Sequence, residues 1–159
     1  MIFVAVGTQK FQLNRLLRQL DELIEAGRIN EPVFAQTGHS DYQPVHYEHT
    51  DFLNKEAFDE YISKCDVLIT HSGVGTIIAG LKRKKPVIVY PRLAKYQEHV
   101  DDHQLQIAES FSEQNLVLLY EENSSLEQLI EEARTHSFAV YHSQRTNVVS
   151  TVRSYLNSI

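Results

Sequence analysis

The chain has 159 residues, 42% of them hydrophobic and 23% charged, with 6 Gly and 4 Pro. This composition is typical of a globular domain and excludes collagen-like, disordered and low-complexity chains. The 21 acidic residues outnumber the 15 Lys and Arg residues, which gives a net charge of -6. Because negative charge repels the phosphate backbone that dominates nucleic-acid affinity, no nucleic-acid partner is expected. A chain of this length supports one hydrophobic core, so we predict a single domain over residues 1–159.

Three features bear on the cellular location of the chain. Cys65 is the only cysteine, so no internal disulfide can form. No stretch reaches the roughly 18 to 20 apolar residues that a membrane-spanning helix needs. Residues Met1–Val6 enter an apolar strand without the basic region of a secretory signal, and neither end carries a lipidation motif. We therefore expect a cytoplasmic chain that reaches a membrane only through a partner or a surface patch.

Short apolar runs with strand character alternate with longer segments in which apolar residues recur at helical spacing. Strands are expected at residues 2–6, 32–37, 45–52, 66–70, 87–90 and 116–120. Helices are expected over Leu13–Ile24 with Gly27 as C-cap, after Asn54, over 74–84 and 98–111, after Ser124 or Ser125, and over Val148–Leu156. This alternation predicts right-handed crossovers and an α/β fold, a single Rossmann-like domain whose parallel sheet is covered by helices on both faces.

A glycine-containing turn follows the strand at 66–70 and opens the next helix, with the sequence His71-Ser72-Gly73-Val74-Gly75-Thr76. A helix N-terminus carries unpaired N–H groups and about half a unit of positive charge, and glycines let the backbone approach an anion closely. Ligands of open α/β sheets bind beyond the carboxyl ends of the strands. The turn therefore indicates a phosphate or diphosphate site, although two glycines can equally serve a tight turn alone. It is neither a Walker loop nor the full dinucleotide fingerprint, because position 78 is Ile.

A second turn, at Gly7, Thr8 and Gln9, stands at the equivalent place after the first strand. We expect a second set of helix-terminal donors there, facing the same crevice. A simple strand-to-helix turn is the alternative. Lys10 either adds a cation toward a phosphate or points into water, and we favour water.

The polar stretch of residues 91–104 follows another strand. Asp102, His103 and Gln104 lie near the expected start of a helix and carry groups that can hydrogen-bond the hydroxyls of a sugar. Capping of that helix by Asp101 or Asp102 is a structural alternative that is compatible with a binding role.

Two other clusters have simple explanations. His99 and His103 are four residues apart and could hold a divalent metal together with Asp102, but we do not expect one, because no further ligand lies at a recognisable spacing. Residues Lys82–Lys85 form a basic cluster at the end of a helix, where cations complement the helix dipole. Contact with anionic lipid is the alternative for this cluster.

Four of these segments, taken together, resemble glycosyltransferase family 28. They are the turn at Gly7-Thr8-Gln9, the loop Gly38-His39-Ser40-Asp41-Tyr42, the turn at 70–76 and the stretch Pro91–Gln104. The chain is similar over nearly its whole length to the C-terminal, donor-binding half of MurG-like enzymes with the GT-B fold. It looks closest to the PssE-type subunit of bacterial exopolysaccharide and capsule synthesis, and more distantly similar to the catalytic subunit of the eukaryotic dolichol-linked GlcNAc transferase.

The resemblance implies roles for individual residues. In the family the glycine turn binds the diphosphate of a UDP-sugar and an Asp-x-x-Gln-like segment contacts the sugar. The substrate-binding residues implied for this chain are Gly7, Thr8, Ser72, Gly73, Val74, Gly75, Thr76, Glu98, Asp102, His103 and Gln104. No cofactor and no metal are implied. MurG-like enzymes hold the ribose with an acidic residue where this chain has Ala79, so ribose binding must use another group or be weaker.

The resemblance also implies a partner, because a GT-B enzyme has two domains and this length suffices for one. The acceptor-binding half would be a membrane-anchored PssD-like subunit, and the pair would transfer galactose from UDP-galactose to a lipid-linked glucose, with inversion and a β-1,4 linkage. Helix-terminal N–H groups would stabilise the departing UDP. The base for the acceptor hydroxyl would come from the partner or from His71 or His103. The alternatives are a non-catalytic stabilising subunit of such a transferase and a sugar-nucleotide epimerase or hydrolase on the same fold.

Overall fold

The computed structural model describes residues 1–142, so the amphipathic segment expected at Val148–Leu156 lies outside the described residues. Six parallel strands form one sheet in the order β3-β2-β1-β4-β5-β6. The strands are β1 (Ile2–Ala5), β2 (Val33–Gln36), β3 (Glu48–Thr50), β4 (Val67–Thr70), β5 (Val87–Val89) and β6 (Leu118–Leu119). The predicted fold, a Rossmann-like α/β domain with a parallel sheet, is confirmed.

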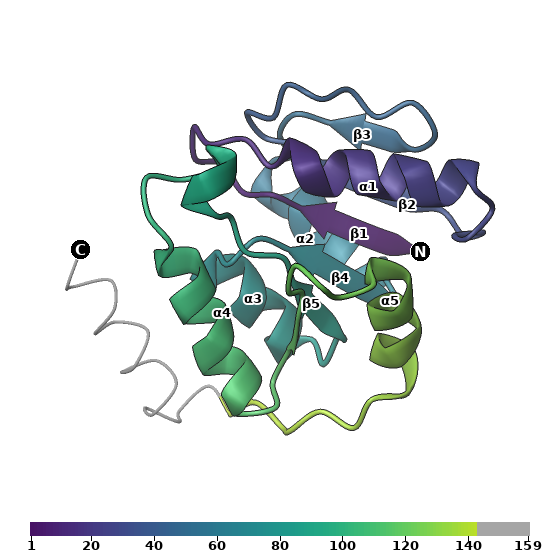
Figure 1. Cartoon of the computed structure of the whole chain (residues 1–159). Helices are drawn as coiled ribbons and strands as arrows, with labels where there is room; N and C mark the ends of the chain where they lie inside the picture. The colour runs from purple at the N-terminus through teal and green to yellow at the C-terminus, as the bar shows by residue number, and fades with distance from the viewer. Residues whose placement is uncertain (143–159) are drawn as a thin grey trace.

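Helices cover both faces of this sheet (Figure 1). They are α1 (Asn14–Glu25), α2 (Lys55–Lys64), α3 (Val74–Lys82), α4 (His103–Glu113) and α5 (Leu126–Thr135), with a short 3-10 helix, η1 (Ala94–Tyr96), before α4. The buried side chains of α1 and α5 share one hydrophobic core, and those of α2, α3 and α4 share a second core on the other face. Because helices cover both faces of the sheet, a site for a polar ligand is expected at the ends of the strands.

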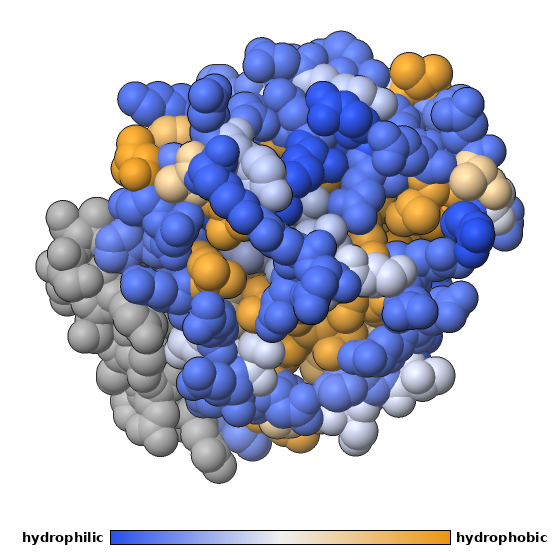
Figure 2. Space-filling view, in the orientation of Figure 1, coloured by the Kyte–Doolittle hydropathy of each residue, from blue (hydrophilic) through white to orange (hydrophobic). Residues whose placement is uncertain are grey.

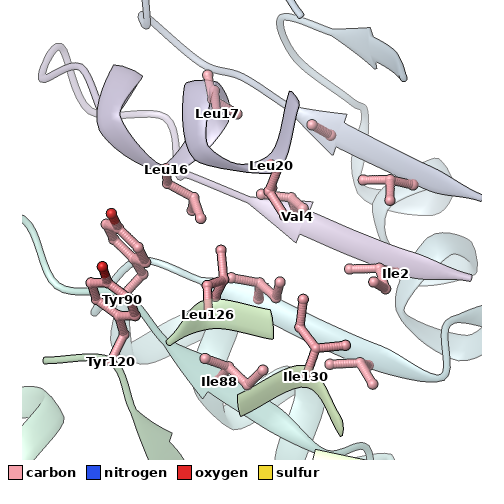
Figure 3. Close-up of a cluster of buried hydrophobic side chains, with 14 of the residues drawn as sticks. Ile2, Val4, Leu16, Leu17, Leu20, Ile88, Tyr90, Tyr120, Leu126 and Ile130 are labelled. Atoms are coloured by element: carbon pink, nitrogen blue, oxygen red, sulfur yellow. The ribbon is translucent and has the colours of Figure 1, made fainter. Parts of the chain in front are cut away.

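Side chains of β1 alternate between the two cores. Ile2 and Val4 pack under α1 and α5 (Figure 3), whereas Phe3 and Ala5 pack on the opposite face. All four side chains are fully buried. A strand with no exposed side chain is typical of the centre of a parallel sheet, which explains why its sequence is continuously apolar.

The predicted caps of three helices are confirmed. Gly27 follows the end of α1 with φ 73°, and the N–H of Arg28 donates to the carbonyl of Leu23, as in a Schellman cap. The side chains of Asn54 and Ser125 accept hydrogen bonds from the backbone N–H three residues further on, at 2.8 and 3.2 Å.

The strand predicted at residues 45–52 is wrong at its start, because β3 begins only at Glu48. The carboxylate of Asp21 on α1 accepts hydrogen bonds from the backbone N–H groups of Val45 and His46, each at 2.9 Å. These N–H groups therefore do not pair with β2. Val45 is 77% exposed, whereas its apolar side chain predicts a buried position in a strand.

The helix predicted at residues 98–111 begins later, at His103. The carboxylates of Glu98 and Asp102 accept hydrogen bonds from backbone N–H groups earlier in the same loop, at 3.0 and 2.9 Å. These contacts fold the loop back on itself before the helix can start. The strand predicted at 116–120 is likewise shorter, since β6 has two residues.

Candidate functional site

The strand order of the sheet reverses at β1, which has β2 on one side and β4 on the other. In open α/β sheets, ligands bind beyond the carboxyl ends of the strands at such a point. The loop of residues 6–13 leaves β1 there, and the turn at 71–73 leaves β4. The N–H of His71 and the hydroxyl of Thr70 both donate to the carbonyl of Ala5, at 3.3 and 2.9 Å. The two turns singled out in the sequence therefore lie side by side.

The turn before α3 offers free hydrogen-bond donors. Gly73 is the N-cap residue of α3, and no side chain among residues 1–142 caps this end of the helix with a hydrogen bond. Ser72 is only 2% exposed, and its Oγ has no hydrogen-bond partner within residues 1–142. A Cβ on Gly75 would meet no atom of the described residues within 4 Å, so the backbone is open on that side. The half-buried Val74 and Thr76 flank it. This arrangement is a cradle suited to an anionic group.

The imidazole of His71 lies between the two turns. Gly7 has φ 83°, in the left-handed region that favours glycine. A Cβ on Gly7 or on Gly73 would lie 2.4 Å from Nε2 of His71. Both positions therefore need glycine because the ring approaches the backbone closely, a reason that the sequence alone does not reveal.

The prediction of a second set of helix-terminal donors directly after β1 is wrong. Thr8 is exposed on the loop of residues 6–13, and α1 begins only at Asn14. The carbonyls of Phe11 and Gln12 accept hydrogen bonds from the side chain of Arg92, at 3.0 and 3.3 Å, and these contacts hold the two residues outside α1. Gly7 and Thr8 thus lie at the crevice as loop residues.

The side chain of His71 is held as a neutral ring. The residue is 5% exposed, and its Nδ1 accepts a hydrogen bond from the guanidinium of Arg92 at 2.9 Å. Burial, and after it the positive charge of Arg92, lower the pKa of His71 to about 3. At neutral pH the ring is uncharged and its Nδ1 is occupied, so it acts as a hydrogen-bond donor through Nε2. The catalytic role predicted for His71 finds no support in this geometry and stays a prediction.

Glu98 is buried in an ion pair. Its Oε2 accepts a hydrogen bond from Nε of Arg15 at 3.0 Å, and its Oε1 accepts from Nη2 of Arg15 at 2.9 Å and from the N–H of Leu93 at 3.0 Å. The guanidinium of Arg15 also lies over the rings of Tyr90 and Tyr96, 4.7 and 4.4 Å from their centroids. Both carboxylate oxygens are occupied, so in this structure Glu98 fixes the loop to α1, and its substrate-binding role stays a prediction.

The three residues at the start of α4 have different surroundings. Gln104 is buried, and its Oε1 accepts a hydrogen bond from the backbone N–H of Arg92 at 3.1 Å, so it joins the group around His71. Asp102 is exposed and accepts from the N–H of Ala94. His103 is half-buried on the same rim. The structure thus brings Gln104 to the turns and leaves Asp102 and His103 at the outer edge.

The histidines considered as metal ligands face one carboxylate. Nδ1 of His99 lies 3.2 Å from Oδ1 of Asp101, and Nε2 of His103 lies 3.8 Å from Oδ2 of the same residue. Asp101, not Asp102, also accepts the hydrogen bond from the N–H of His103 at the start of α4. In the described part of the chain, no group of three or more His, Cys, Asp or Glu side chains is placed to hold a metal ion.

The sequence alone does not predict the roles of two arginines of the site, Arg15 and Arg92. The available signal for Arg92 is its position just beyond an apolar strand, at the edge of the sheet where functional side chains gather. No spacing pairs Arg15 with Glu98, because 83 positions separate them. Long-range partners of this kind become visible only in the fold.

A cavity of about 740 Å³ adjoins the site between α4, the end of β6 and the loop that contains η1. Asp102 is the one predicted site residue among its lining residues, which also include Arg15, Leu93, Leu105 and Tyr120. Figure 2 shows apolar residues gathered on this face of the molecule, between α4 and α5, with hydrophilic residues around them. No helix within residues 1–142 has the length and apolar character needed to cross a membrane.

A six-stranded parallel sheet with an anion cradle at the point where its strand order reverses is typical of nucleotide-binding Rossmann-like domains. The chain belongs to the glycosyltransferase family 28 C-terminal domain family, whose family model matches residues 1–158.

Two curated relatives agree with this family. The chain is 33% identical over 81 residues to the UDP-N-acetylglucosamine transferase subunit ALG13 of Candida albicans, an alignment that covers 51% of this chain and 25% of the relative. It is 27% identical over 114 residues to the UDP-N-acetylglucosamine--N-acetylmuramyl-(pentapeptide) pyrophosphoryl-undecaprenol N-acetylglucosamine transferase of Prochlorococcus marinus, covering 69% of this chain and 30% of the relative. The alignments thus span less than a third of either relative.

Solved structures share the fold. The solution structure of ALG13 has a TM-score of 0.56 at 19% identity and covers 99% of this chain and 96% of that one. MurG of Acinetobacter baumannii has a TM-score of 0.54 at 17% identity and covers 98% of this chain and 49% of that one. The glycosyltransferase SnogD of Streptomyces nogalater has a TM-score of 0.61 at 14% identity, over 98% of this chain and 39% of that one.

Proposed function

We propose that the chain is the donor-binding half of a UDP-sugar glycosyltransferase, and that the turn Ser72–Thr76 binds the diphosphate of the donor. The observation that carries this proposal is the buried hydroxyl of Ser72, which has no partner within residues 1–142 and lies at the uncapped N-terminus of α3. The open backbone at Gly75 gives a phosphate room to approach. The names of the two curated relatives, both N-acetylglucosamine transferases, support a nucleotide sugar as the ligand.

In the proposed reaction the bond between the anomeric carbon and the diphosphate oxygen breaks, and negative charge develops on the departing UDP. The first N–H groups of α3 and the hydroxyl of Ser72 donate hydrogen bonds toward that charge. Because the sheet and the helix fix these donors before the substrate arrives, little reorganisation is needed during the reaction. This is the contribution to catalysis that we assign to the chain itself.

The attacking hydroxyl of the acceptor must lose a proton to a base. Nδ1 of His71, the unprotonated nitrogen of the neutral ring, already accepts a hydrogen bond from Arg92, so it is not free to take that proton. His103 is the better candidate within the chain, because its half-buried imidazole lies at the rim of the site, where its Nε2 is 3.8 Å from the carboxylate of Asp101. A base on the partner is the alternative, and loss of turnover in His103→Gln, with unchanged UDP binding, would support His103.

The proposal extends to the partner and the donor sugar. A membrane-anchored PssD-like subunit would bind the lipid-linked saccharide acceptor and would hold this chain at the cytoplasmic face of the membrane. UDP-galactose is the donor we propose, with β-1,4 transfer in exopolysaccharide or capsule synthesis. UDP-N-acetylglucosamine, the sugar nucleotide in the name of the Candida albicans relative, is the competing donor.

Isothermal titration calorimetry with UDP, UDP-galactose and UDP-N-acetylglucosamine tests the donor site. We expect UDP to bind the unaltered chain and to bind Gly75→Val at least about tenfold more weakly, because the new side chain fills the space reserved for a phosphate. Thermal unfolding checks that this variant stays folded, and Ala26→Val, at the exposed far end of α1, is the control. No heat with any of the three ligands would favour the non-catalytic subunit instead.

A further inference from the structure

A buried arginine lies beneath the candidate site. Arg92 is 0% exposed, and its guanidinium donates hydrogen bonds to three carbonyls of the loop between β1 and α1. Nη2 donates to the carbonyls of Val6 and Phe11, at 2.6 and 3.0 Å, and Nε donates to the carbonyl of Gln12 at 3.3 Å. The planar fork of one guanidinium thus fixes both ends of the loop that carries Gly7 and Thr8.

The same guanidinium fixes the proton of His71. Nη1 of Arg92 lies 2.9 Å from Nδ1 of His71, and Nε2 of Gln104 lies 3.4 Å from that nitrogen. The backbone N–H of Arg92 donates to Oε1 of Gln104, and this orients the Gln104 amide with its nitrogen toward the imidazole. Both neighbours of Nδ1 are donors, so Nδ1 is the acceptor and the neutral ring carries its proton on Nε2.

Arg92 forms no ion pair with a carboxylate within residues 1–142. The nearby Glu98 is paired with Arg15 and acts on Arg92 only through its charge at longer range. A buried cation that is solvated only by carbonyls and an imidazole costs stability, and such groups are concentrated at functional sites. Here the positive charge lies directly behind the crevice in which an anion is expected.

We propose that Arg92 is the positioning residue of the donor site: it holds the loop of residues 6–13 against the turn at 71–73 and keeps Nε2–H of His71 as a fixed donor between Gly7 and Gly73. The proposal rests on the proposed function, because the group that would accept the hydrogen bond from Nε2–H of His71 is the diphosphate of the donor. It assigns His71 the role of a neutral hydrogen-bond donor.

Two substitutions separate the charge of Arg92 from its geometry. Arg92→Lys keeps the charge but loses the planar fork, so His71 should stay neutral while UDP binds several-fold more weakly. Arg92→Met loses both, so we expect UDP to bind at least about tenfold more weakly. In this variant the pKa of His71 should rise above about 3, because burial, the largest cause of the lowered pKa, stays while the positive charge of Arg92 is removed.

Nitrogen-15 NMR of labelled histidine reads the protonation of His71 directly, and His71→Gln identifies its signal. The expected result is a neutral ring with the proton on Nε2 at pH 7 in the unaltered chain and in Arg92→Lys, and a detectable Nδ1–H form or a raised pKa in Arg92→Met. Arg15→Met is the matched control, because it removes the half-buried arginine of this region, which makes no contact with His71.

A charged ring, or a proton on Nδ1, in the unaltered chain would overturn the proposal, and this result does not depend on whether any variant folds. Unchanged UDP affinity and an unchanged ring in Arg92→Met would also overturn it. An unaltered chain that shows the expected ring but does not bind UDP would refute the proposed function and the donor-site role of Arg92, and a changed ring in Arg92→Met would then show that Arg92 sets the protonation of His71 alone.

Discussion

Asp21 shows how one side chain determines the path of a loop in this protein. The residue is 4% exposed on α1, and its carboxylate accepts hydrogen bonds from the hydroxyl of Tyr42 at 2.7 Å and from the N–H groups of Val45 and His46. Burial alone would raise the pKa of Asp21, but these hydrogen bonds, that of Tyr42 first, outweigh it and lower the pKa. The ionised carboxylate is thus bound more strongly in the folded chain than in the unfolded chain.

We expect Asp21→Asn to lower the free energy of unfolding at pH 7 by about 2 kcal/mol, because charge-assisted hydrogen bonds are lost in a buried place. A carboxyl whose pKa is lowered by folding stabilises the fold above its unfolded pKa, near 3.9, and loses that effect as the pH falls through its folded pKa. The difference between the two proteins should therefore shrink below about pH 4. Urea unfolding at pH 7 and pH 3 measures it, and an equal difference at both pH values would refute the assignment.

At the scale of the elements, the imidazole of His71 joins the loop after β1 to the turn after β4. We expect Gly73→Ala to destabilise the fold by about 1–3 kcal/mol, because its Cβ would lie 2.4 Å from the ring. In a His71→Ala background the ring is gone, so the same substitution should cost close to nothing. The coupling energy from the four unfolding curves should therefore be on the order of 1–3 kcal/mol.

Gly80→Ala is the matched control for this double-mutant cycle. Its Cβ would lie 2.7 Å from Leu68 and 3.0 Å from Val87, where α3 crosses the sheet closely, and it would not touch His71. Its cost should be the same with and without the imidazole. An equal cost of Gly73→Ala in both backgrounds would show that the ring does not connect the two turns.

The order of the elements could be predicted from the sequence, whereas several of their ends could not. Continuous apolar runs such as the one at 66–70 predict central strands well, because a parallel strand is buried on both faces. The predictions that were wrong fall where a side chain takes a backbone partner: Asp21 shortens the strand at 45–52, and Glu98 delays the helix at 98–111. Such contacts join residues far apart in the sequence or form only when a loop closes.

For the candidate site, too, local features could be predicted from the sequence and long-range contacts could not. The turn around Gly73 could be found because its glycines follow a strand and open a helix, a local pattern with a direct physical meaning. Arg92 and Arg15 could not be given a role, because their partners come from the loop after β1 and from Glu98, which only the fold brings near. The sequence pattern thus indicates the candidate site, and the long-range contacts that support its geometry become visible in the structure.

At the scale of the whole molecule, helices cover both faces of the sheet and the strand order reverses at β1. The candidate site therefore lies at the carboxyl ends of the strands. The carboxyl edge carries both turns and the loop of residues 91–104, while α3 runs from this edge and ends at the opposite one, near the basic residues Lys82–Lys85. A membrane contact through this cluster would lie far from the proposed donor site. The site is therefore free to face a second protein, as the proposed function requires.

We expect the isolated chain to bind a UDP-sugar without transferring the sugar, since the proposed function places the binding site of the acceptor on the partner. Adding membranes that contain the membrane-anchored partner should start transfer to a lipid-linked saccharide, which incorporation of labelled sugar into extractable lipid would measure. Membranes without the partner and the Gly75→Val variant are the controls, and neither should give labelled lipid. Transfer by the isolated chain to a soluble acceptor would contradict the proposed division of labour, because one domain would then hold both substrates.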